Sequence, residues 1–153
     1  MQQTQHKSLH SSDVYHDCLD RIERLTPGSK PQWGRMSVAQ MLAHCAEIQE
    51  VSNGKPLENT PVIAKLFKAA IRKMVVGDKP FPKNTRTHPL YKQASDRDFV
   101  TEKQRLLNAL ERFVRDASGQ QESLHPLFGK MTPAESGWSM YKHLDHHLSQ
   151  FGV

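Results

Sequence analysis

The stretch His143-Leu144-Asp145-His146-His147-Leu148-Ser149-Gln150 lies near the end of this 153-residue chain and holds three of its nine histidines. Residues four apart on a helix lie one turn apart on the same face, so His143 and His147 are expected to point into one site. Neutral imidazole is the commonest protein metal ligand, and two imidazoles make half of a divalent-metal site. The stretch therefore predicts a metal-binding helix that needs at least one more ligand from elsewhere in the chain.

The same helix carries an apolar stripe that is separate from the histidines. At about 100° per residue, His143, His147 and Gln150 fall within an arc of roughly 60°, and His146 lies beside them. The apolar stripe lies roughly 100° away and is made of four residues, Tyr141, Leu144, Leu148 and Phe151. The histidine face therefore borders the core and suits the floor of a pocket. The alternative is a polar helix edge that happens to be rich in histidine.

A second helix supplies the candidate for the third ligand. Its start is marked by a capping box in Ser37-Val38-Ala39-Gln40, with Met36 and Met41 at the staple positions on either side. Asn53-Gly54 closes this helix. His44 lies in the middle of its apolar stripe, where a lone histidine is usually a satisfied core residue. As the only other histidine within a strongly amphipathic helix, His44 is also the candidate third ligand.

Two further amphipathic helices complete the expected core. One begins near Ser11 or Ser12 and stops at Thr26-Pro27-Gly28. The other begins near Ser95 or Asp96 and ends by Gly119. The histidine helix itself starts at a second capping box, Thr132-Pro133-Ala134-Glu135. No stretch alternates like a strand, so the pattern predicts a single all-α domain over 1–153, an antiparallel four-helix bundle.

Two segments fall outside the four core helices. Residues 1–10 are polar and are expected to form a flexible tail, which leaves His6 and His10 in solvent. Residues 55–95 form an insertion with one basic amphipathic helix, Val62–Val76, and a long loop. The basic helix is either a packed accessory helix with a solvated rim or a lid or docking surface for an anionic substrate, partner or membrane.

Charge and composition narrow the function classes. The net charge of +5 is concentrated in residues 61–86, where seven basic residues stand against one acidic residue. A protein that coats DNA would more often spread its positive charge, so nucleic-acid binding is a weak alternative. The first residues lack the apolar core that a signal peptide needs, and the sequence has no apolar run of about 18 residues, so we expect neither a signal peptide nor a membrane helix. The two cysteines show no metal or redox spacing, which favours a reducing, cytoplasmic location.

If His44, His143 and His147 converge, three neutral imidazoles leave an open coordination position, the catalytic pattern for zinc. Nickel and ferrous iron are also compatible with such a site. The ion would make a bound water or thiol nucleophilic near neutral pH. His146, Gln150 and His125 are then candidates for orienting the ligands or transferring protons.

Three segments together resemble the DinB/YfiT-like superfamily of four-helix-bundle metalloproteins. His143-x-x-His146-His147-x-x-Gln150 looks like the last-helix signature of that family, and residues 33–45 are similar to its first ligand helix. Residues 125–130, together with the chain through Phe151-Gly152, resemble one uncharacterised branch. The resemblance covers most of the chain from about residue 12 and is weakest over 55–95.

The resemblance implies that three histidines bind a divalent metal, here His44, His143 and His147. Some members use the metal to activate a low-molecular-weight thiol, others are metal-dependent hydrolases, and many form dimers. We therefore expect a metal-dependent thiol transferase or hydrolase that acts on a small substrate, such as a low-molecular-weight thiol or an anionic compound. The alternative is a binding or stress-response module with a structural metal and a basic docking helix.

Overall fold

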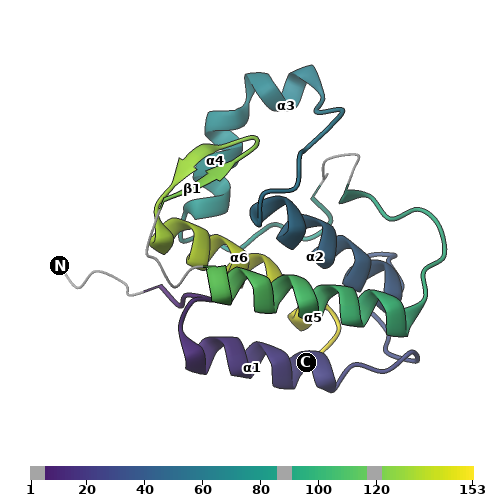
Figure 1. The fold of residues 1–153 in the computed structure, drawn as a ribbon. Helices are drawn as coiled ribbons and strands as arrows, with labels where there is room; N and C mark the ends of the chain where they lie inside the picture. The colour runs from purple at the N-terminus through teal and green to yellow at the C-terminus, as the bar shows by residue number, and fades with distance from the viewer. Residues whose placement is uncertain (1–5, 86–90, 117–121) are drawn as a thin grey trace.

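A computed structural model describes residues 6–85, 91–116 and 122–153, and the described part is mostly helical (Figure 1). Sequence reasoning found the helical class. It missed a short antiparallel hairpin before the last helix, because three-residue strands are too short to show alternation. The elements are α1 Ser12–Glu23, α2 Val38–Ser52, α3 Val62–Leu66, α4 Lys68–Val76, α5 Phe99–Asp116, β1 Ser123–His125, β2 Gly129–Met131 and α6 Pro133–Gln150.

Both expected capping boxes are present, and they set the starts of α2 and α6. The Ser37 hydroxyl accepts from the backbone N–H of Gln40 at 3.1 Å, and the Gln40 side chain accepts from the Ser37 N–H at 2.9 Å. Thr132 and Glu135 make the same reciprocal pair in α6. Each cap contributes about 1 kcal/mol. The helices that carry His44 and His143 therefore begin at positions that their own sequences specify.

The core lies between the four long helices, α1, α2, α5 and α6 (Figure 1). Each of them contributes side chains that are almost fully buried, among them Ile22, Leu42, Leu110 and Leu148. The start of α5 is later than expected from the sequence, at Phe99, because Asp98 is the residue that caps it. The Asp98 carboxylate accepts from the Thr101 N–H at 2.8 Å. The expected end of this helix at Gly119 lies outside the described residues.

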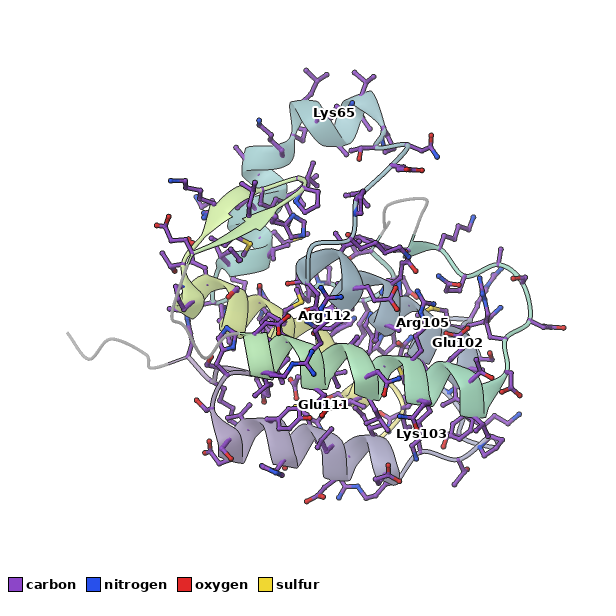
Figure 2. The ribbon with its side chains drawn as sticks, in the orientation of Figure 1. Lys65, Glu102, Lys103, Arg105, Glu111 and Arg112 are labelled. Atoms are coloured by element: carbon purple, nitrogen blue, oxygen red, sulfur yellow. The ribbon has the colours of Figure 1, made fainter. Side chains whose placement is uncertain are left out.

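The basic segment is divided into two helices, whereas a single helix over Val62–Val76 was expected. The break is at Phe67, whose φ of −99° and ψ of 13° depart from helical values. One residue's departure leaves an apolar pattern of fifteen residues unchanged, so the pattern could not show it. In Figure 1, α3 and α4 lie on the far side of α6 from α1, and Figure 2 places Lys65 on the outlying α3.

Two contacts with α6 hold α4 in place. The buried Lys142 ammonium donates to the carbonyl oxygens of Met74 at 2.7 Å and Gly77 at 2.8 Å, at the C-terminal end of α4. A cation at a helix C-terminus is stabilised by the exposed carbonyls and by the helix dipole. Arg72 also donates to both carboxylate oxygens of Glu135 at 2.9 Å. The basic segment is therefore docked on α6 through α4.

Residues 6–10 pack on the helices, so the expected flexible tail is wrong for this part of the chain. Leu9 is fully buried, and its N–H donates to the Gly137 carbonyl at 3.0 Å. His10 Nε2 lies 3.2 Å from the Ser136 hydroxyl, and the His10 ring stacks on Phe113. One buried leucine in a polar stretch gives no periodic signal. Residues 1–5, the rest of the expected tail, lie outside the described chain.

None of the described helices is both long and apolar enough to cross a membrane. The loop expected between the basic segment and the third core helix is described over 77–85 and 91–98. Phe81 and Tyr91 from this loop lie near the histidines of α2 and α6. The insertion therefore contributes to the surroundings of the histidine cluster. The Thr87-His88-Pro89-Leu90 segment falls outside the described residues.

Candidate metal centre

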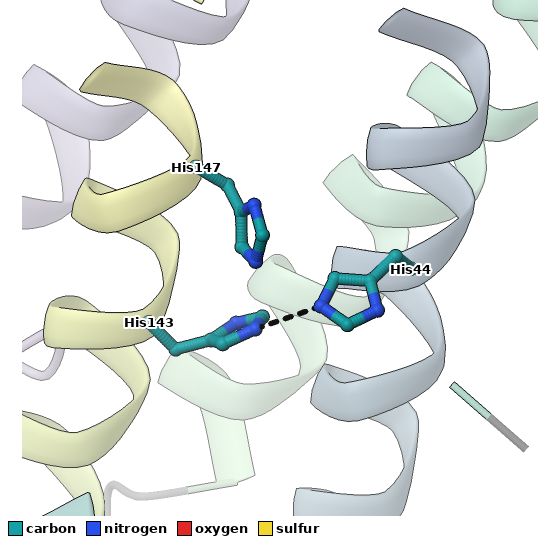
Figure 3. Close-up of side chains that lie close together, drawn as sticks. All are labelled: His44, His143 and His147. Atoms are coloured by element: carbon teal, nitrogen blue, oxygen red, sulfur yellow. Dashed lines mark hydrogen bonds between the residues drawn. The ribbon is translucent and has the colours of Figure 1, made fainter. Parts of the chain in front are cut away.

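Helices α2 and α6 bring His44, His143 and His147 together (Figure 3). One ring nitrogen from each histidine lies within 4.8 Å of the others, and the Nε2 atoms of His44 and His143 are 3.1 Å apart. Four ligands around a tetrahedral zinc, each at about 2.0–2.1 Å, have nitrogens about 3.3 Å apart. The cluster is thus close to metal-binding geometry, and these three histidines could hold a divalent ion.

A backbone carbonyl fixes which nitrogen of His44 faces the cluster. His44 Nδ1 lies 2.8 Å from the carbonyl oxygen of Tyr91, which can only accept, so Nδ1 carries the proton. His44 Nε2 therefore presents a lone pair toward His143. The contact between the two Nε2 atoms is a hydrogen bond when His143 holds its proton there. With that proton on Nδ1, both lone pairs point at one position between the rings.

A chain of two hydrogen bonds fixes His147 in the same way. His147 Nδ1 donates to Gln150 Oε1 at 2.8 Å, and Gln150 Nε2 donates to the carbonyl oxygen of Trp33 at 2.8 Å. This leaves the lone pair on His147 Nε2. Gly34 allows the close approach, since a Cβ there would lie 2.7 Å from Gln150 Nε2 and its φ is +80°. Gln150 thus has the orienting position that outer partners of metal-binding histidines take.

The three rings are neutral at physiological pH, as metal ligation requires. Burial lowers the pKa of His44, and burial together with the neighbouring imidazoles holds the pKa of His143 well below the usual 6.5. Burial is also the main reason that the pKa of His147 falls to about 3. Three neutral imidazoles, two of them held with Nε2 free of a proton, favour a cation between them.

The cluster lies on the wall of a cavity of about 910 Å³, so it is open on one side. His146 also lines this cavity, with its ring centroid 5.0 Å from that of His147 and 5.9 Å from that of Phe81. No bond from His146 to a ligand histidine is found in the described residues. Its position suits proton exchange with a bound molecule better than orientation of a ligand.

His125, the other candidate, lines the cavity from β1. Its Nδ1 accepts from the backbone N–H groups of Leu127 at 3.1 Å and Phe128 at 3.3 Å, and its ring stacks on Phe128. Burial lowers the pKa of His125 to about 4. His125 is therefore a fixed neutral ring whose Nδ1 lone pair is used by its own turn. It does not contribute to the group of three metal-binding nitrogens.

Sequence reasoning missed Tyr91, Trp33 and Lys142. Tyr91 and Trp33 act through backbone carbonyls, which any residue possesses, so no side-chain signal could identify them. Lys142 precedes His143 and is buried against the end of α4, with Nζ 4.4 Å from the Phe81 ring centroid. Lys142 lies on the side of α6 away from the apolar stripe, where a lysine is expected in solvent, so the pattern gave no signal for this contact.

Comparison with known proteins gives a family and no activity. Residues 3–152 match the family model described as "Protein of unknown function (DUF1569)". No curated protein matches the chain, and no solved structure matches it. The family description names no substrate, cofactor or reaction. Function therefore has to be inferred from the residues of the site.

Proposed function

We propose that this chain, which belongs to the DUF1569 family of proteins of unknown function, is a divalent-metal-dependent enzyme. The observation that carries the proposal is the convergence of His44, His143 and His147 beside an open cavity. Structural zinc sites are closed by four protein ligands, whereas catalytic sites keep one position for water or substrate. Three convergent imidazoles on a cavity wall match the catalytic pattern.

The proposed reaction is transfer or hydrolysis by an activated thiol or water. A divalent ion held by the three histidines supplies the Lewis acidity that makes either nucleophile reactive near neutral pH. The thiol would come from a small-molecule substrate, because both cysteines are buried and burial raises the pKa of Cys18 to about 11. His146, which lines the cavity, is the candidate for proton transfer.

Zinc and nickel are the preferred ions, and ferrous iron is compatible. All three accept imidazole, and availability decides between them more than ligand type does. The buried Gln150 and the Tyr91 carbonyl hold two of the rings in one tautomer, which raises the basicity of the facing nitrogens. The selectivity of the site would then follow from its rigid geometry.

The site also supports the proposal that the chain is a DinB/YfiT-like protein. Four long helices share the core, and the three histidines come from two of them, as in that superfamily. We accordingly propose that the architecture is an antiparallel four-helix bundle, to which α3, α4 and the hairpin are additional elements. A homodimer is expected by the same analogy, and light scattering of the purified protein tests it.

Elemental analysis of the purified chain tests the metal proposal directly. We expect close to one divalent ion per chain, lost in His143→Ala and retained in His16→Ala, which removes an exposed histidine of α1. A thermal-shift screen against common thiols follows, since a ligand that binds only the folded state raises its stability. A protein that holds no metal as purified and takes none up on reconstitution contradicts the proposal.

The second candidate is a binding or stress-response module with a structural metal. The observation that favours it is the exposure of four large apolar side chains, Val62, Ile63, Leu66 and Phe67, in and next to α3. Together with Lys65 and Lys68 they could form a docking surface. A fourth protein ligand on the ion, seen by X-ray absorption, would favour this reading. An exchangeable water or thiol ligand would favour the enzyme.

A further inference from the structure

The cavity beside the histidines has one wall, formed by α3 and α4, whose lining side chains are apolar. Residues on one side of α3 and α4 recur at helical spacing, and α6 and the hairpin add Met140, Leu127 and Phe128. The recurring residues are Ile63, Phe67, Ile71 and Met74. A volume of about 910 Å³ is at the upper end for small-molecule sites, which are commonly apolar with a few placed polar groups.

This apolar stripe leads away from the histidines. At its inner end, the Met74 carbonyl accepts from Lys142, the residue before His143. At its outer end, Ile63 of the outlying α3 is 66% exposed, and Phe67, which directly follows α3, is 57% exposed (Figures 1 and 2). Side chains of this size gain when they are covered, and in this structure no described residue covers them. The stripe is therefore an incomplete wall that a bound molecule would complete.

The polar groups of the cavity indicate the charge of such a molecule. No carboxylate lines the cavity among the described residues, and its charged groups are two exposed cations, Arg35 and Lys92. Gln93 is 9% exposed, lines the same cavity, and its buried Oε1 has no hydrogen-bond partner within the described chain. A buried acceptor without a partner costs about 1–3 kcal/mol unless a donor reaches it. The lining thus disfavours a cationic ligand. Gln93 Oε1 could accept a hydrogen bond from a hydroxyl or amide group of a ligand.

We propose that the cavity binds an amphipathic substrate, an aliphatic chain with an anionic or neutral polar head. The head faces His44, His143 and His147, and the chain lies along the stripe from Met74 toward Ile63. This inference rests on the proposed function, since it names the substrate class of that metal site. The apolar wall supplies binding, and the histidine end supplies the chemistry.

Titration calorimetry with a series of fatty acids tests the proposal. Hexanoate, octanoate and dodecanoate, used below their critical micelle concentrations, share one head and differ in chain length. Burial of each added methylene should tighten binding roughly three- to fourfold. Dodecyltrimethylammonium, which has the same chain and a cationic head, should bind at least tenfold more weakly than dodecanoate. Affinity that is independent of chain length, or equal for the two heads, overturns the proposal.

Two neighbouring positions of α4 give a matched pair of variants. Ile71→Trp fills the cavity and should weaken dodecanoate binding at least tenfold. Ala70→Trp adds the same ring at an exposed position outside the cavity and should leave binding unchanged. Circular dichroism checks that both variants fold. If Ile71→Trp is unfolded, Gln93→Met replaces it, with a smaller expected loss. An equal effect of the cavity variant and the Ala70→Trp control overturns the proposal.

A metal-free arm separates this proposal from the proposed function. The zinc-loaded and the chelator-treated protein should gain the same factor in affinity for each added methylene. At every chain length their affinities should differ by one constant factor, which comes from the contact of the head with the metal. A gain that disappears on metal removal overturns the apolar site. If elemental analysis finds no metal but the gain per methylene is present, the metal proposal fails and the apolar cavity stands.

Discussion

Helix α2 carries two polar clusters within two turns, and they differ in what their side chains can still bind. His44 faces α6 and joins the metal-binding group. Glu47 and Glu50 face α5, where Arg105 donates to both. In the histidine cluster, the rings of His44 and His147 are held with Nε2 free of a proton, whereas the carboxylate cluster is satisfied by its own cations.

The carboxylate cluster is nearly closed. Arg105 reaches Glu50 through Nε and Nη2 at 2.7 Å, contacts Glu47, and lies 3.3 Å from Glu102, which precedes it on α5 (Figure 2). Lys55 adds a second cation, 2.5 Å from Glu47. Glu47 and Glu102 are each less than one-tenth exposed. Buried charge here has partners within the chain, and this cluster joins α2 to α5 without any need for a ligand.

The comparison shows how two buried polar clusters can be assigned different roles. Groups that satisfy one another hold helices together, and their removal is expected to change stability. Groups that are oriented but have no partner for their lone pairs within the protein can bind an external ligand, and their removal is expected to change binding. The four predictions below test this division, from the largest expected effect to the smallest.

Arg105→Met should destabilise the protein by about 3–5 kcal/mol, because it leaves Glu47 and Glu102 buried without their shared cation. Metal content should not change. Urea denaturation and elemental analysis of the same preparation measure both quantities. Arg112→Met, which removes an exposed ion pair with Asp116 on the same helix, is the control and should cost less than about 0.5 kcal/mol. A loss of metal in Arg105→Met would show that the carboxylate cluster also affects metal binding, contrary to the roles assigned to the two clusters.

His125 is a buried histidine outside the metal-binding group, and it tests whether such a residue contributes to stability rather than to binding. Its folded pKa is about 4, below the usual 6.5, so the unfolded chain binds the extra proton. Stability is therefore full above pH 6.5 and falls as the pH drops toward 4, by up to about 3 kcal/mol. His125→Asn keeps an acceptor for the Leu127 and Phe128 N–H groups and should reduce this acid sensitivity.

The measurement is urea denaturation of zinc-free protein between pH 4 and 7, so that proton-linked loss of metal does not contribute. His16→Asn, at an exposed position of α1, is the control and should follow the wild-type pH profile. An unchanged pH profile in His125→Asn would show that His125 is protonated in the folded protein, contrary to its burial.

The sequence identified the histidine cluster because its signals are local. His143 and His147 are one turn apart, and His44 lies on a helix whose capping box and apolar stripe can be read from consecutive residues. The carboxylate cluster was not found. Glu47 and Glu50 have the spacing of a solvated helix face, and Arg105 comes from a distant helix. Only packing brings these charges together.

The other differences from expectation have two origins. The burial of Leu9 depends on a contact with Gly137 of α6, which is far away in sequence. The hairpin pairs two strands that are close in sequence but only three residues long, and the break at Phe67 changes the conformation of one residue, so neither alters a periodic pattern. Helix type follows from periodicity, whereas a docked terminus follows from the surface it meets. The basic segment was accordingly predicted in composition and helical content, but not in shape.

Gln150→Leu should weaken metal binding 10- to 100-fold while the three ligands remain, because His147 loses the acceptor that fixes its tautomer. Competition with a chelator measures the affinity. Gln49→Leu is the matched control: Gln49 is equally buried, on α2, and its amide bonds to Asn53 rather than to a ligand. Metal affinity that is equal in both variants would mean that Gln150 only fills space.

Arg72→Met is expected to have the smallest effect, about 1 kcal/mol or less, although Arg72 donates to both oxygens of Glu135 much as Arg105 does to Glu50. The Arg72–Glu135 pair is 31% and 29% exposed, about as exposed as Arg105 and Glu50 at 27% each, so water screens its charges. Unlike Arg105, Arg72 is not paired with a carboxylate as buried as Glu47 or Glu102 among the described residues, so its loss leaves no such charge unpaired. Urea denaturation of Arg72→Met and of Lys73→Met, an exposed neighbour, measures the difference. A cost near that of Arg105→Met would show that an ion pair's geometry, rather than its burial and shared partners, sets its contribution here. The division between the clusters of α2 would then need another physical basis.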